Sequence, residues 1–271
     1  MNRNARFNRQ SFLGPGAQRT LAQRTAAVVG LCGGGSHVVQ QLAHIGLNRF
    51  LLYDPDRVDS SNLNRLVGAT VEDAKRRLPK VSVAERVVRG LRPRAMIQAF
   101  PCQWQQRPLP LRGADIIFGC VDSFAQRRDL EACARRYLIP YLDIGIDVNT
   151  RADEPPQLAG QVILSLPGCL CLTCLGFLTE EKLAAEASRY GDAGNRPQVV
   201  WANGVVASAA VGVAVDLLTG WTRKSQALVF LSYYGNAGTV QPHARVPFLN
   251  LTVECPHYPR ENVGDPVLTN A

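Results

Sequence analysis

The chain has 271 residues and a formal net charge of +8, with 46% hydrophobic and 19% charged residues. This is an ordinary globular composition with enough length to bury a large core, and it excludes a need for stabilising disulfides. The basic balance favours an acidic partner such as ATP, an acidic protein or RNA, although a solvated arginine-rich surface would give the same charge.

Residues 1–10 are basic and lack the apolar stretch of a secretory signal, so export is not expected. The chain also carries eight cysteines. In a protein that is not exported, such cysteines indicate reduced thiols or a metal site. We therefore expect a cytoplasmic protein.

Strand and helix patterns alternate in the first half of the chain. Strands that alternate with helices predict an α/β fold with a mostly parallel sheet and right-handed crossovers. Asp122 or Ser123 is expected to cap the last helix of this half. Buried strand patterns occupy residues 26–30, 49–54, 114–120 and 139–145, and helical patterns occupy residues 37–45, 80–93 and 123–137.

The second half begins with a strand pattern at residues 161–165, which a long crossover segment follows. An apolar helix is then expected over residues 205–218. It is shorter than the roughly 20 residues that span a bilayer, so we expect a buried helix and no membrane contact. Two strand patterns, 227–234 and 237–242, flank a turn at Gly235 and complete the chain.

The first motif with chemical content is the glycine loop "GLCGGGS", which starts at Gly30 between a strand and a helix. Glycines there let the backbone approach phosphate oxygens, and the helix amino terminus adds N–H donors. Asp54 ends the next strand, where an acid commonly accepts ribose hydroxyls. The combination predicts a nucleotide site, although the loop could also be a tight turn that serves packing only. Cys32 in this loop is expected to be a small buried residue.

A polar cluster follows Asp54 in the stretch "SNLNR", and a lysine, Lys80, opens the next helix. The cations and amides of this region suit a triphosphate better than a pyrophosphate bridge. Asp122 follows the strand at 114–120, at the same edge of the sheet, where its carboxylate could hold Mg²⁺. These residues predict a site for ATP and a magnesium ion.

In this order the motifs resemble the ThiF/MoeB family, adenylating enzymes that are related to ubiquitin-activating enzymes. The resemblance covers nearly the whole chain, from "RFNRQ" through "GLCGGGS", "DPDRVDSSNLNR", "PKV" and "CVDS" to "CLTC". It implies an α/β fold with a Rossmann-like, mostly parallel sheet and a C-terminal antiparallel extension. We expect a single domain over residues 1–271, made of an N-terminal arm and helix (1–25), a nucleotide-binding part (26–160) and a part with the crossover segment, the buried helix and the last strands (161–271).

The resemblance also implies roles for individual residues. Arg9 would enter the ATP site of a partner subunit, which implies a homodimer. The catalytic residues would be Arg9, Arg65, Lys80 and the Mg²⁺-binding Asp122, and the nucleotide would be held by Gly30, Gly33, Gly35, Asp54, Asp56, Asn62 and Asn64.

The reaction that the resemblance implies begins with a carboxylate at the end of a small ubiquitin-like or sulfur-carrier protein, typically Gly-Gly. This carboxylate attacks the α-phosphorus of ATP and releases pyrophosphate. The nucleophile is already ionised at neutral pH, so the protein needs no general base and can act by positioning and charge neutralisation. His37 and His44, on the helix of the glycine loop, are therefore expected to be structural.

Cysteines near the end of the crossover indicate a structural zinc site. Cys171 and Cys174 have the C-x-x-C spacing, and relatives place a second such pair near the carboxyl end. Here Cys255 is retained and Tyr258 stands in place of the last cysteine. The fourth ligand would be His257 or Cys169, and the alternative is a decayed site without metal.

Other functions remain open at this stage. The carboxylate could belong to a short peptide or to a modified tRNA base, although RNA is not favoured as a partner. A partner-binding pseudoenzyme and a dinucleotide oxidoreductase are further alternatives. Residues 175–201, where many relatives carry a catalytic cysteine, contain none. We therefore expect no obligatory thioester, with Cys169 as the one candidate nucleophile.

Overall fold

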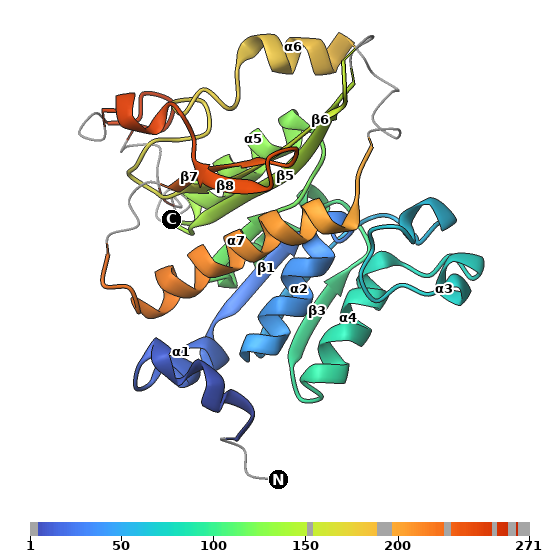
Figure 1. Cartoon of the computed structure of the whole chain (residues 1–271). Helices are drawn as coiled ribbons and strands as arrows, with labels where there is room; N and C mark the ends of the chain where they lie inside the picture. Colours follow the sequence, from blue (N-terminus) through green and yellow to red (C-terminus); the bar gives the residue numbers. More distant parts are fainter. Residues whose placement is uncertain are drawn as a thin grey trace, which may run out of the picture.

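The protein is described here by a computed structural model that covers residues 5–150, 154–188, 197–224, 229–250, 254–259 and 264 (Figure 1). One 8-stranded sheet runs through it in the order β3-β2-β1-β4-β5-β6-β7-β8. Strands β1 to β5 pair in parallel, and the pairs from β5 to β8 are antiparallel. The expected Rossmann-like sheet with a C-terminal antiparallel extension is thus confirmed. The strands are β1 Thr25–Val29, β2 Arg49–Tyr53, β3 Met96–Phe100, β4 Ile116–Gly119, β5 Tyr141–Asn149, β6 Gln157–Ser165, β7 Val229–Tyr234 and β8 Thr239–Pro242.

Helices connect these strands and precede the first one. The α-helices are α1 Ala17–Gln23, α2 Gly33–Ile45, α3 Val71–Lys75, α4 Lys80–Leu91, α5 Phe124–Arg136, α6 Glu180–Ser188 and α7 Val200–Thr219. The 3-10 helices are η1 Ala5–Leu13, η2 Ser60–Asn62, η3 Trp104–Gln106, η4 Leu109–Gly113 and η6 Val246–Phe248.

Two apolar cores lie on the two faces of the sheet. On one face α1, α2, α4 and α7 pack on the strands, and side chains such as Val28 and Val206 meet there. On the other face α5 and the segment that carries the cysteine pair cover the strands, and Ile117 contacts a cluster that includes Leu130. The central strands β1 and β4 are therefore buried on both sides, which explains their continuous apolar sequences.

Helix α7 is the apolar helix of the second half, and it is longer than the expected residues 205–218. Among the described residues it is the one helix long and apolar enough to cross a membrane by length and composition. Its inner face, which includes Ala207 and Ala210, is buried and packs against α2, β5 and β6. This packing is that of a core helix.

The structure differs from the sequence-based expectation at a few elements. Strand β3 was not expected, because it is a partly exposed edge strand without a clear alternation of apolar residues. Helix α2 begins at Gly33 and not at residue 37, since the glycines of the loop form its first turn. Ser123 and not Asp122 caps α5, with its Oγ accepting a hydrogen bond from the backbone N–H of Gln126 at 3.2 Å. Residues 227–228 of an expected strand lie outside the described residues.

The strand order determines where a ligand can bind. The chain runs outward from β1 in one direction to β3 and in the other direction from β4, so the crevice between β1 and β4 lies at the point where the strand order reverses. Loops at the carboxyl ends of β1, β2 and β4 meet around this crevice, beside the middle of β5. The expected organisation as a single domain remains a prediction.

Candidate active site

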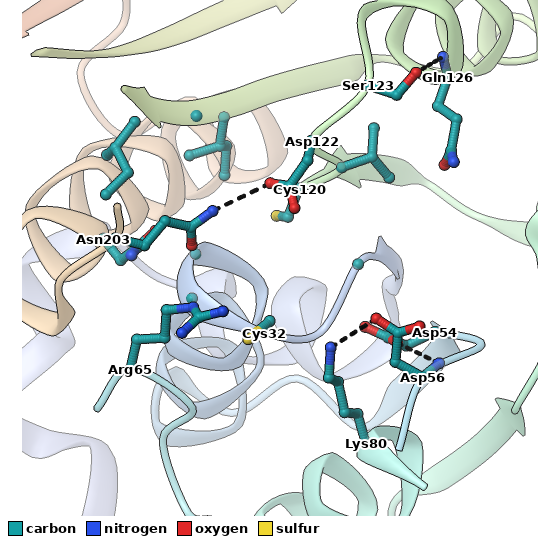
Figure 2. Close-up of a pocket in the computed structure, with 18 of the residues that line it drawn as sticks. Cys32, Asp54, Asp56, Arg65, Lys80, Cys120, Asp122, Ser123, Gln126 and Asn203 are labelled. Carbon is teal, nitrogen blue, oxygen red and sulfur yellow. Dashed lines mark hydrogen bonds and ion pairs between the residues drawn. The ribbon is translucent and has the colours of Figure 1, made fainter. Parts of the chain in front are cut away.

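A cavity of about 460 Å³ lies at the carboxyl ends of β1, β2 and β4 and against the middle of β5. Most of the residues that the sequence placed at the ATP site line this cavity, and they come from separate loops of the sheet (Figure 2). The predicted residues that line it are Gly30, Gly33, Asp54, Asp56, Asn62, Arg65, Lys80 and Asp122.

The glycine loop is close-packed because two of its glycines have no room for a side chain. Gly30 has φ +87, and a Cβ there would overlap the carbonyl oxygen of Cys120 on the neighbouring strand loop. A Cβ at Gly35 would overlap the carbonyl oxygen of Gly30. Gly30 lines the cavity, whereas Gly35 lies behind the loop and lets α2 approach the end of β1.

Asp54 holds this loop in place. One carboxylate oxygen accepts the backbone N–H of Leu31 at 2.7 Å, and the other accepts that of Asp56 at 2.9 Å. Burial raises the pKa of Asp54, and this effect outweighs the nearby Lys80 charge and the two backbone donors, which lower it. The carboxylate sits at the end of β2 beside the glycine loop, where a ribose hydroxyl could reach its remaining lone pairs.

Two cations stand beside the loop. The Nζ of Lys80 lies 2.8 Å from Oδ2 of Asp56, and its side chain is 7% exposed. Burial alone would lower the pKa of Lys80, but the carboxylates of Asp54 and Asp56 outweigh it, so the pKa is raised and the ammonium stays charged. Nη1 of Arg65 donates to the carbonyl oxygen of Ser61 at 2.7 Å, while its buried Nε has no partner among the described residues. An unpaired donor at a cavity wall is suited to a ligand oxygen.

The thiol of Cys32 lies between these two cations (Figure 2). It is half-buried, as a small residue of the loop, and it lines the cavity. Burial raises the pKa of Cys32 more than the charges of Lys80 and Arg65 lower it. The thiol therefore stays protonated and adds no negative charge to the site.

Asp122 occupies the opposite wall of the cavity from Lys80 (Figure 2). Its Oδ1 accepts a hydrogen bond from the Nε2 of Gln198 at 3.2 Å, and the side chain is exposed. Mg²⁺ in nucleotide sites is commonly held by one or two carboxylates together with phosphate oxygens. An exposed carboxylate with one protein donor fits that arrangement.

Other predicted residues lie away from the cavity. Asn64 accepts a hydrogen bond from Nη1 of Arg65 at 2.9 Å and donates to the carbonyl oxygen of Gln198 at 3.2 Å, so it positions the arginine and the crossover segment. Arg9 belongs to η1, which precedes β1 and lies at the other end of the sheet (Figure 1). Within one chain, Arg9 is therefore not brought to the cavity.

Several cavity residues were not found from the sequence. Arg127 lies on the first turns of α5 and lines the cavity, as do Glu186 and Gln198 of the crossover segment. The carboxylate of Glu186 accepts hydrogen bonds at 3.0 Å from the hydroxyl of Ser123 and from the backbone N–H groups of Phe124 and Ala125. The position of Arg127 one turn after the cap of α5 was a signal that could have placed it at the strand ends.

The four predicted zinc ligands form a separate cluster. Sγ of Cys171 and Sγ of Cys174 are 3.6 Å apart, and Sγ of Cys255 is 3.6 Å from that of Cys174. Nδ1 of His257 lies 3.3 Å from Sγ of Cys174, and all four ligand atoms lie within 4.8 Å of one another. With metal–ligand bonds of about 2.0–2.3 Å, tetrahedral zinc ligands are separated by roughly 3.5–3.8 Å, so the cluster fits zinc. His257 and not Cys169 is the fourth member.

The comparisons with known proteins agree with this arrangement. A sulfur carrier protein adenylyltransferase of Thermus thermophilus is 35% identical over 127 residues, which cover 45% of this chain and 46% of the relative. The sulfur carrier protein ThiS adenylyltransferase of Bacillus subtilis is 28% identical over 142 residues, which cover 51% of this chain and 42% of the relative. The matches thus span less than half of either relative.

Among solved structures, E. coli MccB with ATP has the same fold. Its TM-score is 0.69 at 20% sequence identity, and the alignment covers 89% of this chain and 71% of that chain. The sequence model of the ThiF family matches residues 2–248. On this match across nearly its whole length, the chain belongs to the ThiF family.

Proposed function

We propose that this protein catalyses ATP-dependent adenylation of the C-terminal carboxylate of a ubiquitin-like or sulfur-carrier protein, with release of pyrophosphate. The observation that carries the proposal is that Arg65, Lys80 and Asp122 meet around the glycine loop in one cavity. The functions of the relatives support it, since they are adenylyltransferases of sulfur carriers and activating enzymes of ubiquitin-like modifiers.

The charges of the cavity suit this reaction. Lys80 and Arg65 would neutralise the phosphate oxygens, and Asp54 would accept a ribose hydroxyl. Mg²⁺ held by Asp122 would neutralise charge on the phosphates and on the leaving pyrophosphate. Because the positive groups are fixed before the substrate arrives, they can stabilise developing charge without reorganisation.

The reaction does not require a general base. The nucleophile is a carboxylate, which is ionised at neutral pH. Among the described residues that line the cavity there is no histidine. His37, which sequence analysis assigned a structural role, has its pKa lowered by burial and packs against Gly204 of α7.

We also propose that the protein acts as a homodimer in which Arg9 completes the site of the partner subunit. Apolar side chains are exposed along the outer face of α7 and near η1, a surface that a second copy could cover. Phe12 is 67% exposed and Trp201 is 62% exposed, and Phe12 contacts the ring of Trp221 edge-on at 5.4 Å. Large exposed apolar side chains of this kind are typical of protein interfaces.

The cysteine cluster supports a structural zinc ion. Zinc would join the crossover to the C-terminal segment, because Cys171 and Cys174 belong to the first and Cys255 and His257 belong to the second. Thiolate ligands require reduced cysteines, which is consistent with a cytoplasmic location.

We expect direct transfer from the acyl-adenylate without an obligatory thioester on this chain. Cys169 lies outside both the cavity lining and the metal cluster, and its carbonyl oxygen accepts a hydrogen bond from Nη1 of Arg135 at 3.1 Å. After incubation with ATP and the carrier, a non-reducing gel should show no thiol-sensitive adduct. An adduct that disappears in Cys169→Ala would contradict this expectation.

Mass spectrometry tests the proposed function. A carrier protein ending in Gly-Gly should gain one adenylyl group when it is incubated with the protein, ATP and Mg²⁺. A short peptide and a carboxylated tRNA base serve as alternative substrates, and an adenylated product from either one alone would assign the chain to that substrate class. No adenylated product from any of them would favour the pseudoenzyme.

A further inference from the structure

The cavity contains a buried arginine that the proposed chemistry does not yet use. Arg127 lies on α5, which begins at the cavity, and its side chain is 7% exposed. Its Nη1 donates to Oδ2 of Asp143 at 2.5 Å and to the carbonyl oxygen of Ile144 at 3.3 Å. One end of the guanidinium is therefore fixed on β5.

Asp143 is suited to keep this arginine in a lasting ion pair. The carboxylate is fully buried and also accepts the hydroxyl of Tyr141 at 3.0 Å and the Nε2 of Gln161 at 3.3 Å. With three donors the carboxylate is well satisfied, so the ion pair stays in place when a ligand enters. Arg127 is thus a cation with a fixed orientation.

The other edge of the guanidinium carries a donor that no group in the described part of the chain satisfies. Nε is buried without a hydrogen-bond partner among the described residues. Nη2 faces the backbone of Gly145, where a Cβ would lie 2.7 Å from it. Nε and Nη2 form the side of the guanidinium fork, whose two N–H groups match the two oxygens of a carboxylate. Because a buried donor without a partner is unfavourable, this edge is suited to a ligand.

The surroundings of Arg127 indicate which part of the reaction it serves. Arg65 and Lys80 belong to the segment that follows β2, with Lys80 opening α4, whereas Arg127 of α5 lies beside Ile144 and Gly145 in the middle of β5. The β5 residues that line the cavity here are Ile144, Gly145 and Ile146, and Gly145 adds no side chain. An extended chain end without side chains fits against this strand segment better than a phosphate group does.

We propose that the Nε and Nη2 edge of Arg127 binds the terminal carboxylate of the acyl substrate. This inference rests on the proposed function. One carboxylate oxygen forms the new bond to the α-phosphorus of ATP, while the bond from this phosphorus to the bridging oxygen breaks and pyrophosphate leaves with the electron pair. No proton moves, and Arg127 keeps its contact with the oxygen that becomes the acyl carbonyl.

Calorimetric binding tests the proposal without turnover. The protein is first saturated with a non-hydrolysable ATP analogue and Mg²⁺. A short peptide ending in Gly-Gly is then titrated in two forms, as the free acid and as the C-terminal amide. We expect the wild-type protein to prefer the acid. In Arg127→Lys, which keeps the charge beside Asp143 but loses the fork, affinity for the acid should fall by about 10- to 100-fold.

Controls separate this role from a structural one. In Arg127→Lys the affinity for the ATP analogue should stay within about threefold. Arg135→Lys changes another buried arginine of α5, which lies outside the cavity and should keep the preference for the acid. If Arg127→Lys unfolds in a melting experiment, the double variant Arg127→Met with Asp143→Asn removes the pair together and is used in its place. Gly145→Ala, which crowds Nη2, should weaken acid binding as well.

Each outcome decides the proposal. Equal binding of acid and amide by the wild-type protein would overturn it, and so would unchanged acid binding in the Arg127 variants. An equal loss of peptide and ATP-analogue affinity would assign Arg127 to phosphate. If the wild-type protein adenylates the carrier while the Arg127 variants do so equally well, this inference is wrong and the proposed function stands. If the preference for the acid depends on Arg127 but no substrate is adenylated, the carboxylate-binding role of Arg127 stands and the proposed adenylation function is wrong.

Discussion

Replacing Lys80 by methionine separates its role in catalysis from its role in stability. Its ammonium lies 2.8 Å from Asp56, whose side chain is 65% exposed, so the ion pair itself contributes only about 0–1 kcal/mol. Methionine retains most of the apolar stem of the lysine. We therefore expect the free energy of unfolding of Lys80→Met to fall by no more than about 1–2 kcal/mol, part of it from the lost compensation of the buried Asp54.

The expected effect on activity is larger. A unit charge about 4 Å from a phosphate oxygen contributes on the order of 4 kcal/mol at an effective dielectric constant of about 20. Loss of one charged or hydrogen-bonding group that stabilises the transition state in a preorganised site reduces the rate by about 10²- to 10³-fold. The rate of carrier adenylation in Lys80→Met should fall by this factor, as measured by pyrophosphate release.

Lys75→Met is the matched control, because Lys75 is an exposed lysine at the end of α3 outside the cavity. It loses the same charge and should retain full activity. The reasoning would be refuted if folded Lys80→Met kept more than about a tenth of the wild-type rate, since the ammonium would then contribute less than about 1.4 kcal/mol.

Three further predictions concern stability and assembly. The carboxylate of Asp73 accepts a hydrogen bond from Nη1 of Arg86 at 2.8 Å. The hydrogen bonds from this guanidinium hold the pKa of Asp73 well below its usual range. The ion pair therefore stabilises the folded protein above about pH 4, and this stabilisation is lost as the pH falls further. Asp73→Asn should lower the free energy of unfolding by about 1.5–3 kcal/mol at pH 7 and by less at pH 3, because this carboxyl binds protons in the unfolded chain before it does so in the folded one. An equal loss at both values would contradict this ion pair. Elemental analysis should give one zinc per chain. Removal of the metal by a chelator and the substitution Cys255→Ala should each destabilise the fold by more than about 3 kcal/mol. A metal-free protein of normal stability would indicate a decayed site. Mixing inactive Arg9→Ala with inactive Asp122→Ala should restore some activity through hybrid dimers, and no recovery after proven subunit exchange would argue against delivery of Arg9 to the partner.

The half of the site around the glycine loop could be predicted because its signals are local. Gly30 and Asp54 each end a buried strand pattern, and Asp122 follows another. Parallel strands bring their carboxyl ends to one edge of a sheet, so these distant residues are expected to meet. The cavity contains all three.

The burial of the polar face of α5 could not be predicted from the sequence. Arg127, Glu131 and Arg135 recur at helical spacing, a pattern that usually indicates a solvated face, yet all three are buried. Their partners come from other strands: Asp143 of β5 pairs with Arg127, and Ser165 of β6 donates to Glu131 at 2.6 Å. Burial of these charges depends on long-range pairing, which no local pattern shows.

The metal cluster shows the same limit. The pair Cys171 and Cys174 was recognisable from its spacing, but the sequence alone left Cys169 as an alternative to His257 for the fourth ligand. Cys169 is closer to the pair along the chain, and its backbone is held by Arg135. The fold of the C-terminal segment brings His257 to within 3.3 Å of Cys174, and this contact could not be inferred from spacing.

ATP–pyrophosphate exchange is the most direct measurement of the central claim, that one cavity binds ATP and activates a carboxylate. The exchange requires reversible formation of the acyl-adenylate. We predict that labelled pyrophosphate enters ATP when wild-type protein, Mg²⁺ and the carboxylate substrate are present together, and that Asp122→Ala abolishes this exchange although the variant remains folded. Full exchange in Asp122→Ala would contradict the account.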